Sequence, residues 1–156
     1  MKKLKKHKKI KLLLVATSGG HLTEGLRLIG DIPKTTLIVS TNESKRLSEL
    51  KYKTYPLKVA KSRFVFFTAN FIRLFSLVLK ERPDWIITTG AECGLIAVIA
   101  GKILFRKTIF IETVTRYKNK TKAATLCYPL VTKFYVQHKE ALPLFGKKAE
   151  YIGGLL

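Results

Sequence analysis

The fold is decided by residues 10–21, which read IKLLLVATSGGH. Residues 10–16 form an apolar run of strand length, and Thr17-Ser18-Gly19-Gly20 is the kind of glycine-rich sequence that ends a strand in a tight turn. Apolar side chains then recur at helical spacing from residue 22 to residue 29. A buried strand that passes through a glycine turn into an amphipathic helix predicts the first half of a β–α–β unit.

The same alternation continues to the end of the chain. Apolar or β-branched runs predict further strands at residues 35–40, 54–59, 85–88, 107–111 and 132–136. Helical patterns predict further helices at residues 43–50, 63–81, 93–105, 117–126 and 139–145. This alternation predicts an α/β fold: a Rossmann-like parallel sheet with helices on both faces, in a single domain over residues 10–156.

The chain is strongly basic, but its composition is that of a folded protein. Its 156 residues include 30 Lys and Arg against 10 Asp and Glu, a formal charge of +20, yet 47% of them are apolar. Disordered chains lack this much apolar sequence, so a folded domain is expected. The excess of cations predicts an anionic counterpart, which could be nucleic acid, anionic lipid or a phosphorylated substrate.

A basic tail, residues 1–9, precedes the domain. Residues 1–11 hold seven lysines, and 23 basic residues still face the ten acidic ones when these seven are set aside. The apolar run behind the tail is short and leads into the glycine turn rather than a cleavage site, which argues against a secretory signal peptide. No apolar run has the roughly 20 residues that a membrane-spanning helix needs.

The cysteines and histidines show no metal-binding pattern. Cys93 and Cys127 lack CxxC spacing and lie in apolar sequence, as reduced core thiols of a cytosolic protein do. His7, His21 and His138 are too scattered for paired ligation. The sequence therefore predicts neither a metal nor a cofactor.

Ligands of parallel α/β sheets bind beyond the carboxyl ends of the strands, so the residues there form the candidate site. After the first strand, Gly19 and Gly20 let the backbone approach an anion closely, and the next helix offers free amides to a phosphate. His21, beside this turn, is the best titratable candidate. The turn is not GxGxxG, and Ser40-Thr41-Asn42 stands at the second strand end in place of an acidic residue suited to a ribose, which disfavours a dinucleotide site. A turn without any ligand is the alternative.

Two later strand ends extend this candidate site. Gly90 lies in a second turn that opens onto a helix, and Glu112 follows the fifth strand. Glu112 is a candidate general base or acceptor for a sugar hydroxyl, and it could face one cleft with His21. The alternative is that Glu112 only pairs with Arg116 across a loop. The Gln137-His138 pair after the sixth strand is expected mostly at the surface.

The helix at residues 63–81 is rich in phenylalanine. Its expected apolar stripe is Phe64, Phe67, Phe71, Phe75 and Val78, and a second stripe holds Asn70, Arg73, Leu77 and Lys80. A Phe-rich helix flanked by basic residues suits a surface that rests in the lipid interface. The alternative is a helix that is buried on two sides.

The run Ser18-Gly19-Gly20-His21-Leu22-Thr23-Glu24 resembles the S-G-G-H-x-x-E opening of the acceptor-side subunits of split GT-B glycosyltransferases. That family includes the membrane subunit of the dolichol-linked GlcNAc transferase and bacterial capsule and exopolysaccharide subunits called galactosyltransferase enhancers. The resemblance covers roughly residues 10–156 and continues, in order, through Ile111-Glu112, Arg116, Tyr128-Pro129, Val136-Gln137 and the terminal run from Tyr151 to Leu156. The chain departs from the eukaryotic members in having a lysine tail where they have a spanning helix, and its turn at residues 90–94 has less Gly and Pro.

The resemblance implies a fold and a reaction. The fold would be the N-terminal half of a GT-B enzyme, similar to the N-domain of the peptidoglycan GlcNAc transferase. The chain would be the acceptor-binding subunit, inactive alone, of a UDP-sugar-dependent hexosyltransferase of capsule or exopolysaccharide biosynthesis. A companion subunit would bind the UDP-sugar, and the acceptor would be a polyprenyl-diphosphate-linked sugar.

The resemblance also implies roles for individual residues. His21 and Glu112 would be catalytic, with either as the base. The acceptor diphosphate and sugar would contact Ser18, Gly19, Gly20, Thr23, Gly90 and Arg116. The companion would contact the C-terminal Gly153, Gly154, Leu155 and Leu156.

Charge and the Phe-rich helix together predict peripheral attachment to the cytoplasmic face of an anionic membrane. The expected membrane contacts are Lys2, Lys3, Lys5, Lys6, Phe64, Phe67, Phe71 and Arg73. Nucleic acid is disfavoured as the partner because the phenylalanines gather on one helix and no RNA-recognition pattern is present. A membrane scaffold that recruits a complete transferase, without catalytic residues of its own, is the other alternative.

Overall fold

The computed structural model describes residues 9–33, 35–42, 46–116 and 118–154, and in them the chain forms one sheet of seven strands, all parallel, in the order β3-β2-β1-β4-β5-β6-β7. The strands are β1 Ile10–Val15, β2 Thr35–Asn42, β3 Lys53–Leu57, β4 Trp85–Thr88, β5 Lys107–Ile111, β6 Lys133–Val136 and β7 Ala149–Tyr151. The α-helices are α1 Gly20–Ile29, α2 Arg46–Glu49, α3 Arg63–Glu81, α4 Ala91–Ile103 and α5 Lys122–Cys127, and a 3-10 helix, η1, spans Lys139–Leu144. This confirms the predicted Rossmann-like α/β fold.

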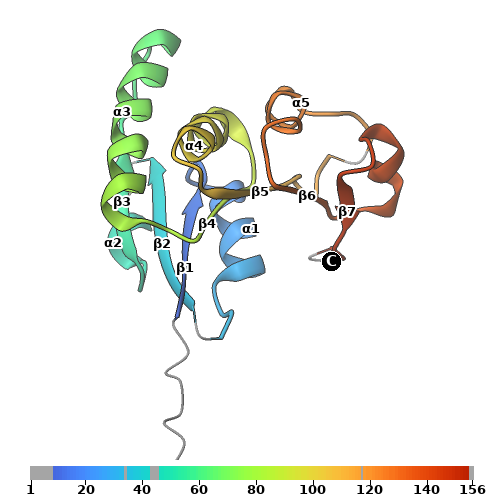
Figure 1. The fold of residues 1–156 in the computed structure, drawn as a ribbon, viewed down its shortest axis with the longest axis horizontal. Helices are drawn as coiled ribbons and strands as arrows, with labels where there is room; N and C mark the ends of the chain where they lie inside the picture. Colours follow the sequence, from blue (N-terminus) through green and yellow to red (C-terminus); the bar gives the residue numbers. More distant parts are fainter. Residues whose placement is uncertain (1–8, 34, 43–45, 117, 155–156) are drawn as a thin grey trace, which may run out of the picture.

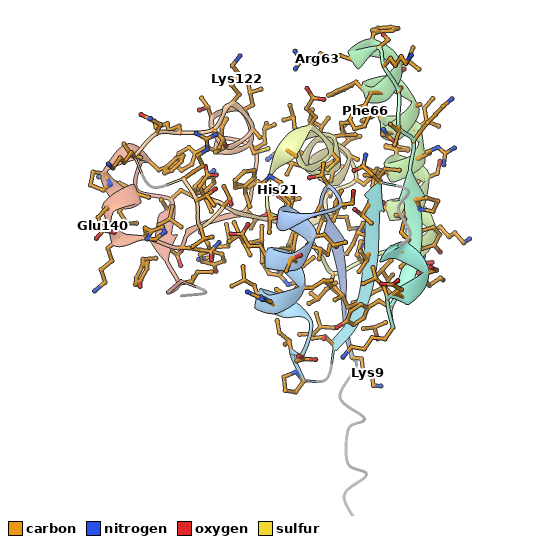
Figure 2. The ribbon with its side chains drawn as sticks, turned by 180° about the vertical axis from the view of Figure 1, so that it is seen from behind. Lys9, His21, Arg63, Phe66, Lys122 and Glu140 are labelled. Carbon is orange, nitrogen blue, oxygen red and sulfur yellow. The ribbon has the colours of Figure 1, made fainter. Side chains whose placement is uncertain are left out.

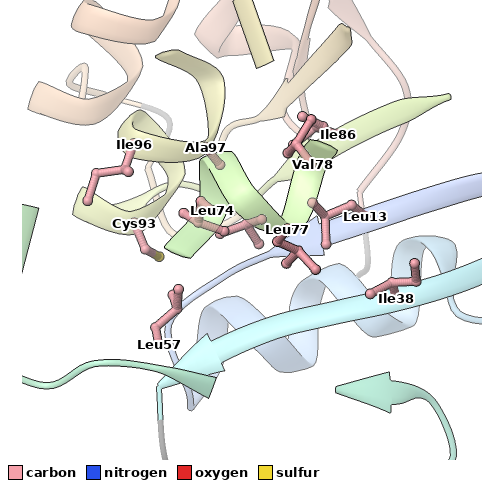
Figure 3. Packing of buried hydrophobic residues seen from close by; sticks show 11 residues of the cluster. Leu13, Ile38, Leu57, Leu74, Leu77, Val78, Ile86, Cys93, Ile96 and Ala97 are labelled. Atoms are coloured by element: carbon pink, nitrogen blue, oxygen red, sulfur yellow. The ribbon is translucent and has the colours of Figure 1, made fainter. Parts of the chain in front are cut away.

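Helices cover both faces of the sheet, with α3, α4 and α5 on one side and α1 on the other (Figure 1). Successive residues of β1 serve the two layers, because side chains alternate along a strand. Leu13 and Val15 join the core under α3 and α4, part of which is drawn in Figure 3, whereas Leu12 and Leu14 pack with the α1 layer. A third cluster, around Phe110 and Phe134, fills the space under α5 and η1.

The chain reverses direction across the sheet at its centre. From β1 it moves outward through β2 to β3, and it then returns through α3 to β4 on the other side of β1. The carboxyl ends of β1 and β4 therefore lie side by side, with connections leaving in opposite directions. Crevices at such a point are the ligand sites of open α/β sheets.

Helix boundaries differ from the prediction near α5 and η1. The helix expected from residue 117 begins at Lys122, because the Thr121 hydroxyl accepts a hydrogen bond from the Ala124 amide at 3.0 Å and caps the helix there. The residues before Thr121 instead form part of a loop, and residue 117 lies outside the described residues. The helix expected at 139–145 is a 3-10 helix with Pro143 inside it.

The buried side of α3 is not the phenylalanine stripe that the sequence predicts. Its buried residues are Asn70, Leu74, Leu77, Val78 and Glu81, while Phe64 is 77% exposed, Phe67 and Phe71 are half-buried and Arg73 is exposed. Asn70 fixes the rotation of the helix, since its Oδ1 accepts from the Lys58 amide at 2.7 Å and its Nδ2 donates to the Lys58 carbonyl at 2.9 Å. An apolar pattern alone could not reveal this polar anchor.

Some of the predicted residues lie outside the described part of the chain, and others are buried. Lys2, Lys3, Lys5, Lys6, Leu155 and Leu156 lie outside the described residues. Cys93 and Cys127 are buried in different clusters, and burial raises the pKa of each thiol to about 12. Within the described ranges, no helix is both long and apolar enough to cross a membrane.

Candidate functional site

A pocket of about 630 Å³ opens at the carboxyl ends of β1, β4 and β5; it is called the strand-end pocket below. The predicted residues that line it are Gly20, His21, Thr23, Gly90, Glu112 and Arg116, and the other lining residues are Glu24, Arg27, Thr89, Ala91, Thr113, Val114, Thr115, Thr121 and Ala123. Ser18 and Gly19 belong to the turn that leads into it. Figure 2 places His21 toward the same end of the molecule as Phe66 and Lys122, away from Lys9.

Two glycine turns form one wall of the strand-end pocket. Gly19 has a φ of 105° and Gly90 a φ of 114°, backbone conformations that disfavour any residue with a side chain. Within the described residues, no side chain caps the N-terminus of α1 or of α4. Backbone amides at the start of both helices are therefore available to an anion, and the helix dipoles favour negative charge there.

The open space at the first turn suits a ligand that approaches the backbone. Among the described residues, no heavy atom outside the adjoining backbone lies within 4 Å of the position that a Cβ would take at Gly19 or Gly20. At the second turn, a Cβ on Gly90 would come within 3.6 Å of the His21 ring. The imidazole thus lies against the Gly90 turn, between the two helix N-termini.

His21 occupies the start of α1 with one ring nitrogen unused. Its Nδ1 is buried and has no hydrogen-bond partner in the described part of the chain. Its backbone carbonyl accepts a hydrogen bond from the Thr89 hydroxyl at 2.9 Å, which ties α1 to the end of β4. A ligand hydroxyl or phosphate oxygen could supply the missing partner of Nδ1.

Glu112 follows β5 and is 2% exposed. Its carboxylate accepts hydrogen bonds from the Thr113 amide at 3.1 Å and from the Thr121 hydroxyl at 3.3 Å. Burial raises the pKa of this carboxyl group above its ordinary value, and the neighbouring negative charge of Glu24 acts in the same direction. No ion pair joins Glu112 to Arg116 in the described residues, so the alternative of a simple loop ion pair is wrong.

Sequence reasoning assigned no role to two residues beside this pocket. Glu24 lies in the quoted motif and is only 6% exposed, and Gln137, predicted mostly at the surface, is 3% exposed. One feature of the sequence could have revealed the position of Glu24. Together with Gly20, Thr23 and Arg27, it repeats at helical spacing on one face of α1, and that face lines the pocket. No feature of the sequence could have revealed the burial of Gln137, because that burial depends on how β6 lies beside β5.

The remaining predicted residues lie outside the pocket. Gly153 and Gly154 follow β7 at the far edge of the sheet and do not line it. Phe64, Phe67, Phe71 and Arg73 belong to α3 and do not line it either. In the part of the chain that the structure describes, no three His, Cys, Asp or Glu side chains are grouped so that they could hold a metal ion.

Comparison with known proteins gives matches in both sequence and structure. No protein-family model matches the chain. The UDP-N-acetylglucosamine transferase subunit ALG14 of Mus musculus is 29% identical, over 94% of this chain and 83% of that protein. The Homo sapiens protein of the same name is 27% identical with the same coverage.

Among solved structures, MurG of Acinetobacter baumannii superposes with a TM-score of 0.78 at 10% identity, over 93% of this chain and 46% of MurG. The S. aureus MnaA–UDP structure superposes with a TM-score of 0.77 at 14% identity, over 93% of this chain and 45% of MnaA. The chain thus spans a little under half of these two proteins, and the likeness to them shows the fold alone. That fold is the N-terminal half of a GT-B enzyme such as MurG, and with the sequence similarity to ALG14 it marks this chain as a glycosyltransferase-related protein.

Proposed function

We propose that this protein is the acceptor-binding subunit of a two-chain glycosyltransferase. With a companion that binds a UDP-sugar, it transfers the sugar to a polyprenyl-diphosphate-linked sugar in capsule or exopolysaccharide biosynthesis. The observation that carries the proposal is the strand-end pocket, in which two uncapped helix N-termini lie beside a buried carboxylate. One pocket thus offers both a diphosphate site and a base.

The diphosphate is held at the glycine turns. The first amides of α1 and α4 bind its oxygens, and Ser18 adds a hydroxyl donor. Thr23 lines the pocket beside them, with its hydroxyl donating to the Gly19 carbonyl at 2.9 Å. Arg27 and Arg116, both on the pocket lining, supply positive charge. Amides and cations hold a diphosphate without a metal ion between them, because both carry positive charge toward its oxygens.

The acceptor hydroxyl loses its proton to a base as it attacks the sugar carbon and the UDP leaves. Glu112 suits this role because burial raises the pKa of its carboxyl group. His21 suits it because its buried Nδ1 has no partner in the described residues. Both side chains line the strand-end pocket. The transfer rates of variants substituted at Glu112 or at His21 decide which of the two is the base.

A companion subunit supplies the other half of the cleft. A single Rossmann-like domain forms one wall, and this chain corresponds to 46% of MurG. The relative ALG14 is named as a subunit of a transferase. Gly153 and Gly154, which follow the edge strand β7, begin the C-terminal segment that we assign to the contact with the companion.

The membrane contact lies on α3 and the tail. The exposed apolar side chains of α3 are Phe64, Val65, Ile72 and Leu79, and the cations Arg63, Arg73 and Lys80 are exposed on the same helix. Figure 1 shows the N-terminal turns of α3 extending beyond α4 at the carboxyl edge of the sheet. A helix of this kind rests in the lipid interface, and the lysine tail adds attraction to an anionic, cytoplasmic leaflet.

The test of the activity is reconstitution. This chain and a candidate companion are purified separately and mixed with a polyprenyl-diphosphate-linked monosaccharide and radiolabelled UDP-sugars. We expect transfer by the mixture and none by either chain alone. A companion that is fully active alone on a soluble acceptor would overturn the catalytic role and leave a scaffold. If DNA and RNA show no gel shift even at low salt, where nonspecific phosphate binding is strongest, the alternative of a nucleic-acid-binding module is ruled out.

The test of the membrane contact is sedimentation with vesicles of neutral or anionic lipid. Each Lys near an anionic surface contributes about 1 kcal/mol, so deletion of residues 1–9 is expected to weaken binding to anionic vesicles most. Phe64→Ser is expected to weaken binding to both kinds of vesicle, and Thr68→Ser, another exposed position of α3, serves as its control. If a protein that lacks residues 1–9 and also carries Phe64→Ser sedimented as the wild type does, the proposed membrane contact would be contradicted.

A further inference from the structure

The carboxylate of Glu24 connects three elements around the strand-end pocket. It projects from α1 and accepts a hydrogen bond from the Val114 amide at 2.6 Å, in the loop between β5 and α5. It also accepts one from the Gln137 side-chain amide at 2.5 Å, just beyond β6. The same Gln137 nitrogen donates to the Glu112 carbonyl at 3.0 Å. Directly through the Val114 amide, and indirectly through Gln137 and the Glu112 carbonyl, one buried carboxylate therefore connects α1 to the backbone of residues 112–114.

Val114 is held on its other side as well. Its carbonyl oxygen lies 2.7 Å from Nε2 of His138. The loop has no regular secondary structure at this point, so its backbone groups depend on side chains from outside for their hydrogen bonds. The amide is bonded by α1 and the carbonyl by the segment after β6, which together fix the position of the loop.

Stability alone does not account for a carboxylate at this place. Glu24 and Glu112 are both buried, and two negative charges close together in a buried place disfavour each other. A neutral glutamine could accept the same two hydrogen bonds with a smaller desolvation penalty. Unfavourable buried charges of this kind are concentrated at functional sites.

We propose that Glu24 is a positioning residue of the strand-end pocket: through Val114 and Gln137 it holds the β5–α5 loop, and thereby the Glu112 carboxylate, in place. The catalytic part of this inference rests on the proposed function. The ordering of the loop does not rest on it, because it follows from the hydrogen bonds alone.

The negative charge of Glu24 has a second effect, on the protonation of Glu112. The charged or titratable groups around the two glutamates are His21 and Arg27 of α1, Arg116 of the β5–α5 loop, Cys127 of α5 and His138 after β6. Glu24→Gln removes the negative neighbour and keeps the acceptor oxygen. It is therefore expected to lower the pKa of Glu112 while the loop stays in place.

The first experiment measures hydrogen exchange of the free protein by mass spectrometry. In Glu24→Ala we expect exchange of the Val114 region to rise about tenfold, which corresponds to the loss of a charge-assisted hydrogen bond, with β1 and β4 unchanged. Glu24→Gln stays near the wild type, and Glu49→Ala, at an exposed site on α2, is the control. Unchanged exchange in Glu24→Ala, or an equal rise in β1 and β4, would overturn the proposal. If Glu24→Ala does not fold, Gln137→Met tests the same hydrogen-bonded contacts, because it removes the side-chain amide that bonds to Glu24 and to the Glu112 carbonyl.

The second experiment measures transfer by the reconstituted pair. Glu24→Ala is expected to lower kcat by about 100-fold with little change in KM for the UDP-sugar, the usual effect of a small misplacement of catalytic groups. Glu24→Gln restores most of kcat, and when Glu112 is the base it moves the acidic limb of the pH profile to lower pH. If Glu24→Gln were as inactive as Glu24→Ala with an ordered loop, positioning would be the wrong role. A wild-type pair without activity would contradict the proposed function but not the exchange result.

Discussion

Glu81 and Glu112 are both buried, yet their surroundings are opposite. Glu81, 7% exposed at the end of α3, accepts hydrogen bonds from Lys53 at 2.6 Å and Tyr55 at 2.5 Å, and Lys11 lies 3.4 Å away. These hydrogen bonds lower the pKa of its carboxyl group to about 2. Among the described residues, the hydrogen-bond donors to Glu112 are neutral, and burial together with a nearby second glutamate raises its pKa.

The contrast shows that burial alone does not decide what a carboxylate does. Two lysines and a tyrosine keep Glu81 ionised, and its carboxylate joins α3 to β1 and β3. Glu112 keeps an affinity for protons, which a general base needs. The first site is suited to stability, and the second to chemistry. Four experiments test this division.

The largest effect is expected from Glu112→Gln. If Glu112 is the base, transfer by the reconstituted pair falls by about 10²- to 10⁴-fold, because the proton acceptor is lost while the side-chain shape is kept. Glu81→Gln is the matched control and is expected to leave kcat unchanged. Equal rates for Glu112→Gln and the wild type, with a large loss in His21→Ala, would transfer the role of base to His21.

The effects on stability should have the reverse order, larger for Glu81→Gln than for Glu112→Gln. Glu81→Gln is expected to lower the free energy of unfolding by about 2–3 kcal/mol, since it leaves Lys53 and Lys11 without their anion. Urea denaturation measures this, with Glu49→Gln on the exposed face of α2 as the control. Glu112→Gln is expected to keep or increase stability. A larger loss in Glu112→Gln than in Glu81→Gln would invert the division.

The pH dependence of stability should have opposite signs at the two sites. The folded-state pKa of Glu81 is below its ordinary value of 4.5, so its contribution is present above about pH 4.5 and is lost as the pH falls toward 2. The folded-state pKa of Glu112 is raised, so its ionisation destabilises the fold as the pH rises above about 4.5. Urea midpoints measured across this range should converge for Glu81→Gln and the wild type at low pH. For Glu112→Gln and the wild type they should diverge as the pH rises, and parallel curves would contradict either assignment.

The smallest effect is expected from Tyr55→Phe. Removal of the hydroxyl deletes one donor to Glu81, and a hydrogen bond to a charged group contributes about 1.5–3 kcal/mol at most. Because two lysines remain, we expect a loss near the lower end, about 1.5 kcal/mol. Tyr151→Phe, at a half-exposed ring on β7, is the control in the same urea titration. A loss as large as that of Glu81→Gln would show that the lysines contribute little.

The backbone of this fold could be predicted because its signals are local. The apolar run before Gly19 and the need for a positive φ at that glycine place a strand, a turn and a helix without knowledge of distant residues. The same reasoning found Gly90 and Glu112 at later strand ends, and the structure brings both into one pocket with His21.

The parts that could not be predicted depend on distant residues. Glu24 and Gln137 meet across 113 positions of sequence, and only the placement of β6 next to β5 brings them together. The buried side of α3 could not be chosen because apolar residues surround the helix, and its rotation is fixed by Asn70 on the backbone of Lys58. The α5 boundary likewise depends on the Thr121 cap.

The parallel sheet separates the two carboxylate sites by the length of its central strand. Lys11 lies near the amino end of β1, and the turn at Gly19 follows its carboxyl end, several residues and about 15 Å further on. Substitutions at sites this far apart have additive free energies when they share no partners. Protein engineering can therefore alter the amino end of the sheet to raise thermal tolerance without disturbing the residues around the strand-end pocket at the opposite end.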